Sequence, residues 1–172
     1  MINQTKKSSK KIVSWQPPAS IWTNPIHFMA SGFGMGAMPV MPGTFATLAA
    51  IPLYLVLIKL GLVLYVIITI TAVLAGVYLC QKANDDFGTE DHPAAAWDEI
   101  AGFLIVMIAI PPTWYYIMLG FALFRYFDIA KPGPIGWIDR KVHGGLGVML
   151  DDVAAALASW IILQTIIWFM SR

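Results

Sequence analysis

The chain has 172 residues, of which 58% are hydrophobic and only 12% are charged, and its mean hydropathy is +0.69. Soluble domains usually contain about 25% charged residues, so the composition excludes an ordinary soluble protein and favours one compact membrane bundle. The net charge of +1 gives no general attraction to nucleic acid, and the one cysteine, Cys80, excludes an intrachain disulfide.

The N-terminal residues 1–20 are polar and basic, and no apolar stretch follows their lysines. We expect a disordered cytoplasmic tail here rather than a cleavable signal peptide. Asn24 and Pro25 are typical of a helix start, as its cap and its first residue. Residues 26–42 are apolar but rich in glycine and proline, which favours an interfacial or re-entrant piece over a spanning helix.

The rest of the chain alternates between apolar and polar segments. The apolar stretches, which we expect to be helices, are 44–60, 62–80, 100–110, 113–127 and 153–170. Crossing about 30 Å of hydrocarbon takes about 20 residues, so several of these helices are short for a span. The sequence therefore predicts an all-α, polytopic membrane bundle over residues 21–172, with short helices and cytoplasmic polar loops.

The prolines at 111 and 112 leave two topologies open. If they turn a short helical hairpin, the polar segments 81–99 and 128–152 lie on the same side of the membrane. If they only kink one long helix, the two segments lie on opposite sides. The hairpin places every lysine and arginine except Lys59 and Arg172 in the cytoplasm, so the positive-inside rule favours it.

All ten acidic residues fall in these two polar segments. The first segment holds Asp85, Asp86, Glu90, Asp91, Asp98 and Glu99, and the second holds Asp128, Asp139, Asp151 and Asp152. Carboxylates bind hard cations such as Mg²⁺, and these cations bind phosphate oxygens. The pattern indicates a cation site at a bilayer surface.

Three motifs in the polar segments each have an ordinary structural explanation beside a functional one. Asp98 and Glu99 open an apolar helix and could simply cap it, or they could bind a metal ion. Arg125, Asp128 and Lys131 follow at spacings of three and could form a surface salt bridge, or they could hold a metal-bridged phosphate.

The third motif is the glycine-rich run 144–147 before Asp151 and Asp152. It could be a flexible connector with a helix cap, or its glycines could let the backbone approach an anion. His143 is either a proton donor or a surface residue. Thr44, near the Pro42-Gly43 bend, could cap a helix or contact a phosphate through its hydroxyl.

In this order, the motifs resemble the bacterial phosphatidylglycerophosphatase A family over residues 24–160. The matching residues are Asn24-Pro25, Gly32-Phe33-Gly34, Pro42-Gly43-Thr44, Trp97-Asp98-Glu99, Gly102, Phe124-Arg125, Phe127-Asp128, Lys131-Pro132, Pro134-Ile135, His143-Gly144-Gly145, Gly147, Met149 and Asp151-Asp152. Related sequences often carry Gly-Ser where this chain has Ala46-Thr47, so these two residues receive no role.

The resemblance implies a Mg²⁺-dependent phosphatase of the bacterial inner membrane, with its site facing the cytoplasm and a helical bundle built around a central helix. Its substrate would be phosphatidylglycerophosphate, a membrane lipid, and its product phosphatidylglycerol. The expected catalytic residues are Asp98, Glu99, Asp128 and Asp152. The expected metal ligands are Asp98, Glu99, Asp128, Asp151 and Asp152, and the expected phosphate-binding residues are Arg125, Lys131, Thr44 and Gly145.

Other functions remain open on the residues alone. An ion-coupled transporter also places carboxylates in a membrane, but here they gather at the ends of the apolar stretches. A CDP-alcohol phosphotransferase would need an Asp-x-x-Asp-Gly-x-x-Ala-Arg core, which is absent. A non-enzymatic membrane assembly protein is the third alternative. The attacking group (water or a side chain), the number of metal ions and the oligomeric state stay undetermined.

Overall fold

The computed structural model describes residues 16–172. The predicted tail, residues 1–20, lies outside the described residues up to position 15, and its last two residues, Ala19 and Ser20, belong to a short helix. The all-α prediction is confirmed, since every regular element from residue 16 onward is helical. The elements are η1 (Ala19–Trp22), α1 (Pro25–Ala30), η2 (Met35–Ala37), α2 (Pro42–Leu57), η3 (Ile58–Leu60), α3 (Leu62–Phe87), α4 (Trp97–Val106), α5 (Trp114–Ala130), α6 (Pro134–Lys141) and α7 (Gly144–Met170).

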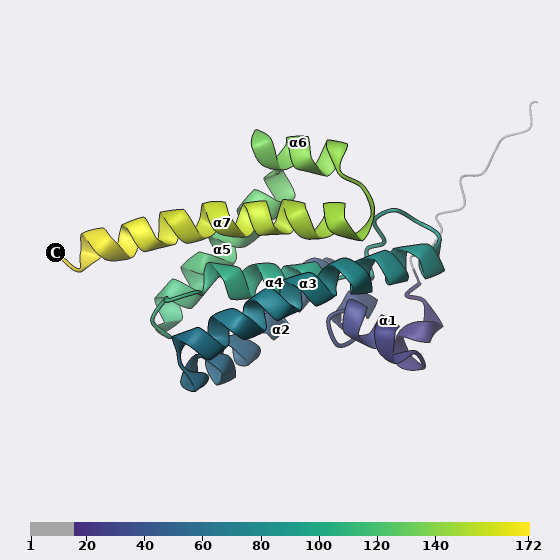
Figure 1. The fold of residues 1–172 in the computed structure, drawn as a ribbon, viewed down its shortest axis with the longest axis horizontal. Helices are drawn as coiled ribbons and strands as arrows, with labels where there is room; N and C mark the ends of the chain where they lie inside the picture. The colour runs from purple at the N-terminus through teal and green to yellow at the C-terminus, as the bar shows by residue number, and fades with distance from the viewer. Residues whose placement is uncertain (1–15) are drawn as a thin grey trace, which may run out of the picture.

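The N-terminal segment folds as expected from its cap. The Asn24 side chain accepts a hydrogen bond from the Ile26 N–H at 2.9 Å, and Pro25 is the first residue of α1. After α1 the chain turns through Gly32 and Gly34, both at positive φ, into the single turn of η2. Neither short helix can cross a bilayer. Helix α1 packs against the C-terminal end of α3 (Figure 1).

Helix α4 is the centre of the bundle. It has 10 residues, and all of them except Glu99 are buried. It contacts α2, α3, α5 and α7, which surround it in Figure 1. Apolar side chains all around a helix are stable only in such a buried position. Gly102 lets α5 approach closely, because a β-carbon there would lie 2.6 Å from the Phe124 ring.

The α4–α5 connection is the short hairpin that the tandem prolines allowed. Helix α4 ends at Val106, and α5 starts at Trp114 after both prolines. From α7, Trp160 and Gln164 donate hydrogen bonds to the carbonyl of Ile108, at 2.9 and 3.3 Å. Helix α5 then returns to the end of the bundle where α4 began, so the two polar segments meet.

Two helix boundaries differ most from the prediction, because polar residues extend both helices. Helix α3 continues to Phe87 rather than ending near Cys80. Side-chain pairs one turn apart stabilise this extension, Gln81 with Asp85 at 2.8 Å and Lys82 with Asp86 at 2.5 Å. Helix α7 begins at Gly144 rather than Val153. The interpretation of residues 144–147 as a flexible connector is therefore wrong.

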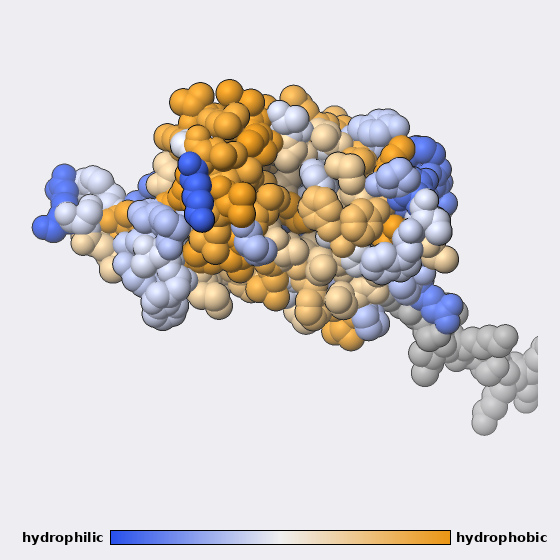
Figure 2. All heavy atoms as spheres, turned by 90° about the horizontal axis from the view of Figure 1, so that it is seen from below, coloured by the Kyte–Doolittle hydropathy of each residue, from blue (hydrophilic) through white to orange (hydrophobic). Residues whose placement is uncertain are grey.

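Within residues 16–172, three helical segments are long and apolar enough to cross a membrane: Pro42–Leu60, Leu62–Phe87 and Gly144–Met170. Apolar surface covers the middle of the molecule in Figure 2, and hydrophilic residues gather toward the two ends of its long axis. Helices α4 and α5 have only 10 and 17 residues, so they form a short hairpin between the longer helices.

Candidate active site

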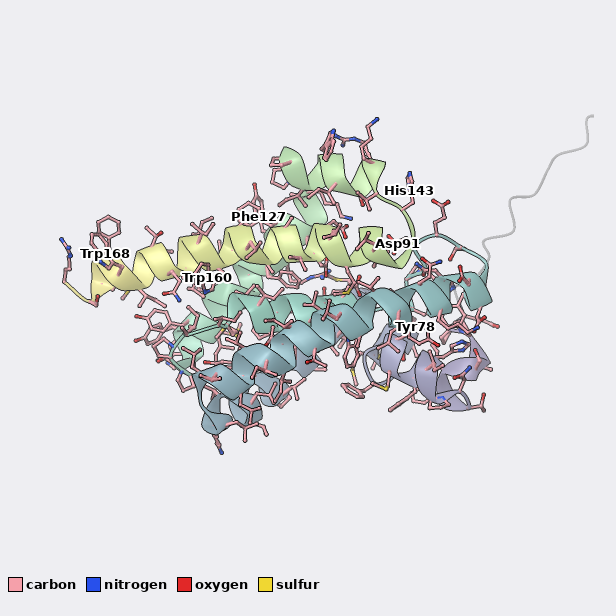
Figure 3. All side chains as sticks on the ribbon, in the orientation of Figure 1. Tyr78, Asp91, Phe127, His143, Trp160 and Trp168 are labelled. Atoms are coloured by element: carbon pink, nitrogen blue, oxygen red, sulfur yellow. The ribbon has the colours of Figure 1, made fainter. Side chains whose placement is uncertain are left out.

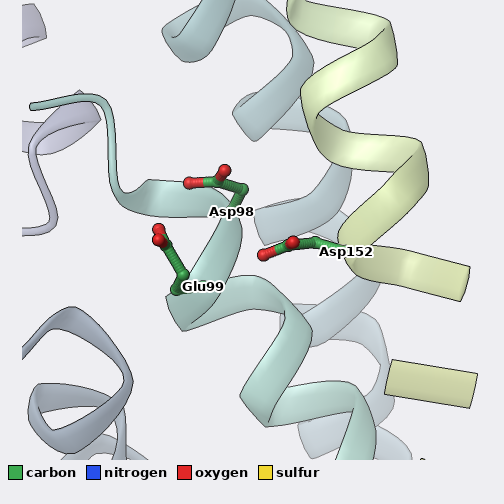
Figure 4. A group of neighbouring side chains, drawn as sticks. All are labelled: Asp98, Glu99 and Asp152. Atoms are coloured by element: carbon green, nitrogen blue, oxygen red, sulfur yellow. The ribbon is translucent and has the colours of Figure 1, made fainter. Parts of the chain in front are cut away.

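Three carboxylates from two helices share one buried position. Asp98 and Glu99 lie in the first turn of α4, and Asp152 comes from the third turn of α7. One oxygen from each of the three lies within 4.8 Å of the other two. Figure 4 shows the three side chains pointing toward one another. The capping alternative fails for Asp98, because the N-cap of α4 is Ala96 and no side chain bonds there.

The three carboxylates lack the partners that buried anions need. Asp98 is 7% exposed and Asp152 is 3% exposed. Asp98 Oδ1, Glu99 Oε2 and Asp152 Oδ2 are buried without a hydrogen-bond partner. Desolvation raises the pKa of Asp98, and the adjacent Glu99 carboxylate raises it further. A cation held among these oxygens would balance their charge, and all-oxygen ligands suit Mg²⁺.

Arg125 is the nearest cationic side chain, and it only partly balances this charge. Its Nη1 atom lies 2.6 Å from Asp128 Oδ2 and 3.9 Å from Glu99 Oε1. The guanidinium is buried, and neither Nε nor Nη1 has a well-aligned hydrogen-bond acceptor. Asp128 thus joins the site through Arg125, and it also lies close to Asp152. The guanidinium keeps donors available for a bound anion.

The N-terminal end of α2 closes the site on another side. Thr44 Oγ1 is buried without a partner, so this hydroxyl does not cap α2, which was the structural alternative to contacting a phosphate. The preceding Gly43 is buried directly against the site. A β-carbon at Gly43 would lie 2.0 Å from Glu99 Oε1 and 3.2 Å from Arg125 Nη1. A side chain at this position would therefore displace the Glu99 carboxylate or the start of α2.

The sequence did not predict a role for Gly43 in the site, although this residue belongs to the Pro42-Gly43-Thr44 motif. The available signal was a glycine directly after a proline at the start of a helix, where the first backbone N–H groups are unpaired. Such a helix terminus favours anions. Its importance here follows from the neighbouring Glu99 and Arg125, which are distant in sequence.

Lys131 and Asp151 form a second ionic group beside the first. Lys131 caps α5 in the left-handed conformation, with φ of 41°. Its ammonium pairs with Asp139 Oδ1 at 2.5 Å and also with Asp151. Burial lowers the pKa of Lys131, but the two ion pairs outweigh burial and raise it above its usual value. The structure does not bring Asp151 into the carboxylate group, and it turns Lys131 toward Asp139 instead of Asp128.

The structure gives Gly145 a packing role, which corrects the prediction that it approaches an anion. Its N–H already donates to Gln81 Oε1 at 2.7 Å. A β-carbon at Gly145 would lie 2.2 Å from the Val77 carbonyl oxygen. The glycine therefore lets α7 pack closely on α3.

His143 lies outside the buried group. It is exposed, and its Nδ1 atom is 3.6 Å from Glu90 Oε2. Figure 3 shows His143 and Asp91 at the same end of the molecule. This position agrees with the surface alternative for His143.

Residues 28–167 match the family model described as Phosphatidylglycerophosphatase A. The chain is 43% identical over 138 residues to Phosphatidylglycerophosphatase A of Escherichia coli strain K12, with 80% of each chain covered. It is 45% identical over 149 residues to Phosphatidylglycerophosphatase A of Haemophilus influenzae, covering 86% of this chain and 91% of the relative. No solved structure matches the chain.

Proposed function

The chain belongs to the phosphatidylglycerophosphatase A family, and on this basis we propose that it converts phosphatidylglycerophosphate to phosphatidylglycerol and phosphate in phospholipid biosynthesis. The family membership favours an enzyme over the transporter and the assembly protein. One observation supports this chemistry most directly: the three carboxylates have buried oxygens without hydrogen-bond partners, and the Arg125 guanidinium lies beside them, 3.9 Å from Glu99 Oε1. This arrangement suits a metal ion together with an anionic phosphate.

Asp98, Glu99 and Asp152 would hold the Mg²⁺ ion on which we propose that the reaction depends. Bound there, Mg²⁺ supplies a Lewis acid that withdraws charge from the phosphate oxygens. Mg²⁺ usually takes only one or two carboxylates directly, so one carboxylate of the group remains free to accept a proton.

Arg125 and Thr44 would bind the oxygens of the terminal phosphate. The guanidinium offers a planar fork of N–H donors, and Asp128 holds that fork in place at 2.6 Å. The Thr44 hydroxyl adds a neutral donor. Fixed donors of this kind stabilise the charge that spreads over the phosphoryl oxygens during transfer.

The remaining steps concern water and the leaving group. Water attacks phosphorus in line, the bond from phosphorus to the glycerol oxygen breaks, and the water proton passes through a carboxylate to that oxygen. We assign the proton acceptor to the group formed by Asp98, Glu99 and Asp152, with Asp128 as the orienting partner of Arg125. These assignments leave Asp151 and Lys131 as structural neighbours of the site.

For the location, we propose the bacterial inner membrane with the site on the cytoplasmic side. The candidate spans support a membrane protein. The site lies at the end of the bundle where α3 finishes and α7 starts, and the charge bias of the sequence assigns that end to the cytoplasm.

The deciding experiment measures phosphate release from phosphatidylglycerophosphate by purified full-length protein. We expect release with Mg²⁺ and none with EDTA. Asp98→Asn, Asp128→Asn and Asp152→Asn should each reduce turnover at least about a hundredfold while the protein stays folded and membrane-inserted. Asp85→Asn, on the exposed side of α3, is the matched control and should behave as wild type. Normal activity in all three site variants at low Mg²⁺ would refute the shared site.

A further inference from the structure

We propose that the segment from η1 to the start of α2 inserts into the cytoplasmic leaflet of the membrane without crossing it. Large apolar side chains form its exposed surface, which we call the N-terminal apolar patch: Trp22, Phe28, Met29, Phe33, Val40 and Met41. Trp22 and Val40 are the most exposed of them, at 64% and 65%. Exposed apolar patches of this kind mark contact with a partner protein or a membrane. This lipid contact is separate from the proposed reaction.

Continuity with the candidate spans identifies lipid as the partner. The patch leads directly into Pro42–Leu60, where Phe45 and Leu48 are also exposed. An apolar groove of about 370 Å³ begins at Met29 and Phe33 and continues between α2, α3 and α4. Residues 19–58 contain no lysine, arginine, aspartate or glutamate. Soluble proteins have about 25% charged residues, so such a long uncharged surface suits acyl chains better than water.

The irregular backbone after α1 is already prepared for an apolar surrounding. A backbone N–H without an acceptor is costly in hydrocarbon, whereas in water a solvent molecule can accept its hydrogen bond. Every N–H from Ser31 to Met38 donates a hydrogen bond within the protein, at distances of 2.8 to 3.3 Å. The turn through η2 can therefore lie among lipids although it is not a long helix.

Backbone strain accompanies the exposure of two patch residues. Gly32, Phe33 and Gly34 are all left-handed, with φ of 62°, 60° and 89°, and Met41 has φ of 51°. This conformation is unfavourable for Phe33 and Met41, because each has a β-carbon. The turn lets the Phe33 N–H reach the Phe28 carbonyl at 3.0 Å while the Phe33 side chain stays exposed. Contact of the exposed side chains with acyl chains would offset this cost.

The contacts between α1 and α3 set the depth of the patch. His27 of α1 is buried, with Nε2 2.8 Å from Asp86 Oδ2 and Nδ1 2.9 Å from Ser20 Oγ. Asp86 also pairs with Lys82 at 2.5 Å in the last turns of α3. Tyr78 is exposed one turn earlier, at the end of α3 nearest α1 in Figure 3. Charged groups stay in water and tyrosine favours the interface, so α1 lies where headgroups meet acyl chains.

The test places a fluorescent NBD label on Met29→Cys and Val40→Cys, each in a Cys80→Ala background. The protein is reconstituted in vesicles of phosphatidylethanolamine and phosphatidylglycerol formed with or without iodide, so that iodide reaches both sides. A lipid nitroxide near the headgroup should quench about half or more of the fluorescence at both positions, and iodide should quench little.

Two matched variants calibrate the quenching. Thr89→Cys is exposed in the polar loop after α3 and should respond to iodide alone. Leu157→Cys is exposed on the candidate span α7 and should respond most to a nitroxide at the end of the acyl chain. A thermal unfolding midpoint equal to that of Cys80→Ala shows that a labelled variant is folded, and Trp22→Cys replaces any variant that is not.

Three results would overturn the proposal. Iodide quenching as strong as at Thr89→Cys would place the patch in water. Protection from both quenchers would show that protein covers the patch, as in a contact with a second copy of the chain. Strongest quenching by the deep nitroxide, as at Leu157→Cys, would show that the segment enters the middle of the bilayer.

Discussion

Arg125 has two anionic neighbours at unequal distances, and this inequality defines its role. The close contact with Asp128 fixes the guanidinium, while Glu99 at 3.9 Å is too far for a hydrogen bond. Removing Arg125 would therefore leave the Glu99 and Asp128 carboxylates without their shared cation. Buried ion pairs broken in this way leave an uncompensated charge, so the effect on stability must be measured with the effect on catalysis.

We predict that Arg125→Ala lowers kcat/KM for phosphatidylglycerophosphate by about a hundredfold or more, because the phosphate loses its bidentate donor. Arg125→Lys should recover only part of the activity, since an ammonium lacks the planar fork. Steady-state kinetics measures the effect on catalysis, and a thermal unfolding curve of the same variant measures the effect on stability. Wild-type kinetics in Arg125→Ala would remove this residue from the site.

Gly43 provides a second prediction at this scale. Gly43→Ala places a methyl group 2.0 Å from Glu99 Oε1, so Glu99 or the start of α2 must shift. We expect kcat to fall at least about tenfold, because small displacements of catalytic groups are costly. Gly43 is not among the glycines at positive φ, so the contact with Glu99, not backbone strain, should cause the loss. Equal activity in Gly43→Ala and wild type would show that Glu99 tolerates displacement.

Among the elements, the α4–α5 hairpin has the largest functional consequence. It returns Arg125 and Asp128 to the end where Asp98 and Glu99 begin α4. A single kinked helix could not make these contacts, since it would carry Arg125 to the opposite end. Short helices are tolerated because α2, α3 and α7 surround α4 and shield it.

The hairpin predicts the membrane sidedness of two loops. In a Cys80→Ala background, cysteines at Thr89 and Arg140 should both react with a membrane-impermeant maleimide from the cytoplasmic side only. Both positions are exposed. Gly136, also in α6, is unsuitable for a cysteine because a β-carbon there would lie 2.5 Å from the Lys131 oxygen. Labelling of the two cysteines from opposite sides would contradict the topology.

For the molecule as a whole, the buried carboxylates connect metal binding to stability. Three close anions are expected to destabilise the fold, and the cation that we propose for this site would remove that cost. A ligand that binds only the folded state stabilises it by about 2.7 kcal/mol at a concentration one hundred times its Kd. We therefore expect the carboxylate group to lower the stability of the metal-free protein, because its charges are placed for the proposed reaction rather than for folding.

We predict that Mg²⁺ raises the thermal unfolding midpoint of the wild type and that EDTA reverses the change. Asp152→Asn should lose most of this response. Without Mg²⁺, the same variant should unfold at a temperature equal to or above that of wild type, because one buried charge is gone. Differential scanning calorimetry in one detergent would measure both effects, with Asp85→Asn as the control. A full Mg²⁺ response in Asp152→Asn would exclude this residue as a ligand.

The sequence by itself determined the class of the fold and the types of residue that gather at the candidate site. Hydropathy and helix signals are local properties, so the helical bundle, the Asn24 cap and the proline turn were predictable. The ordered motifs also identified the family. Asp98, Glu99 and Asp152 were among the predicted ligands because carboxylates at the ends of apolar helices are rare and costly.

The tertiary structure alone decided which residues meet. Asp151 and Asp152 are adjacent in sequence but about 100° apart around α7, so one pairs with Lys131 and the other joins the carboxylate group. The spacing could not reveal this, because it depends on where α7 begins and on how it is rotated against α4. The roles of Gly43 and Gly145 could not be predicted from the sequence either, because they depend on contacts with distant residues. A β-carbon would meet Glu99 Oε1 at Gly43 and the Val77 carbonyl oxygen at Gly145.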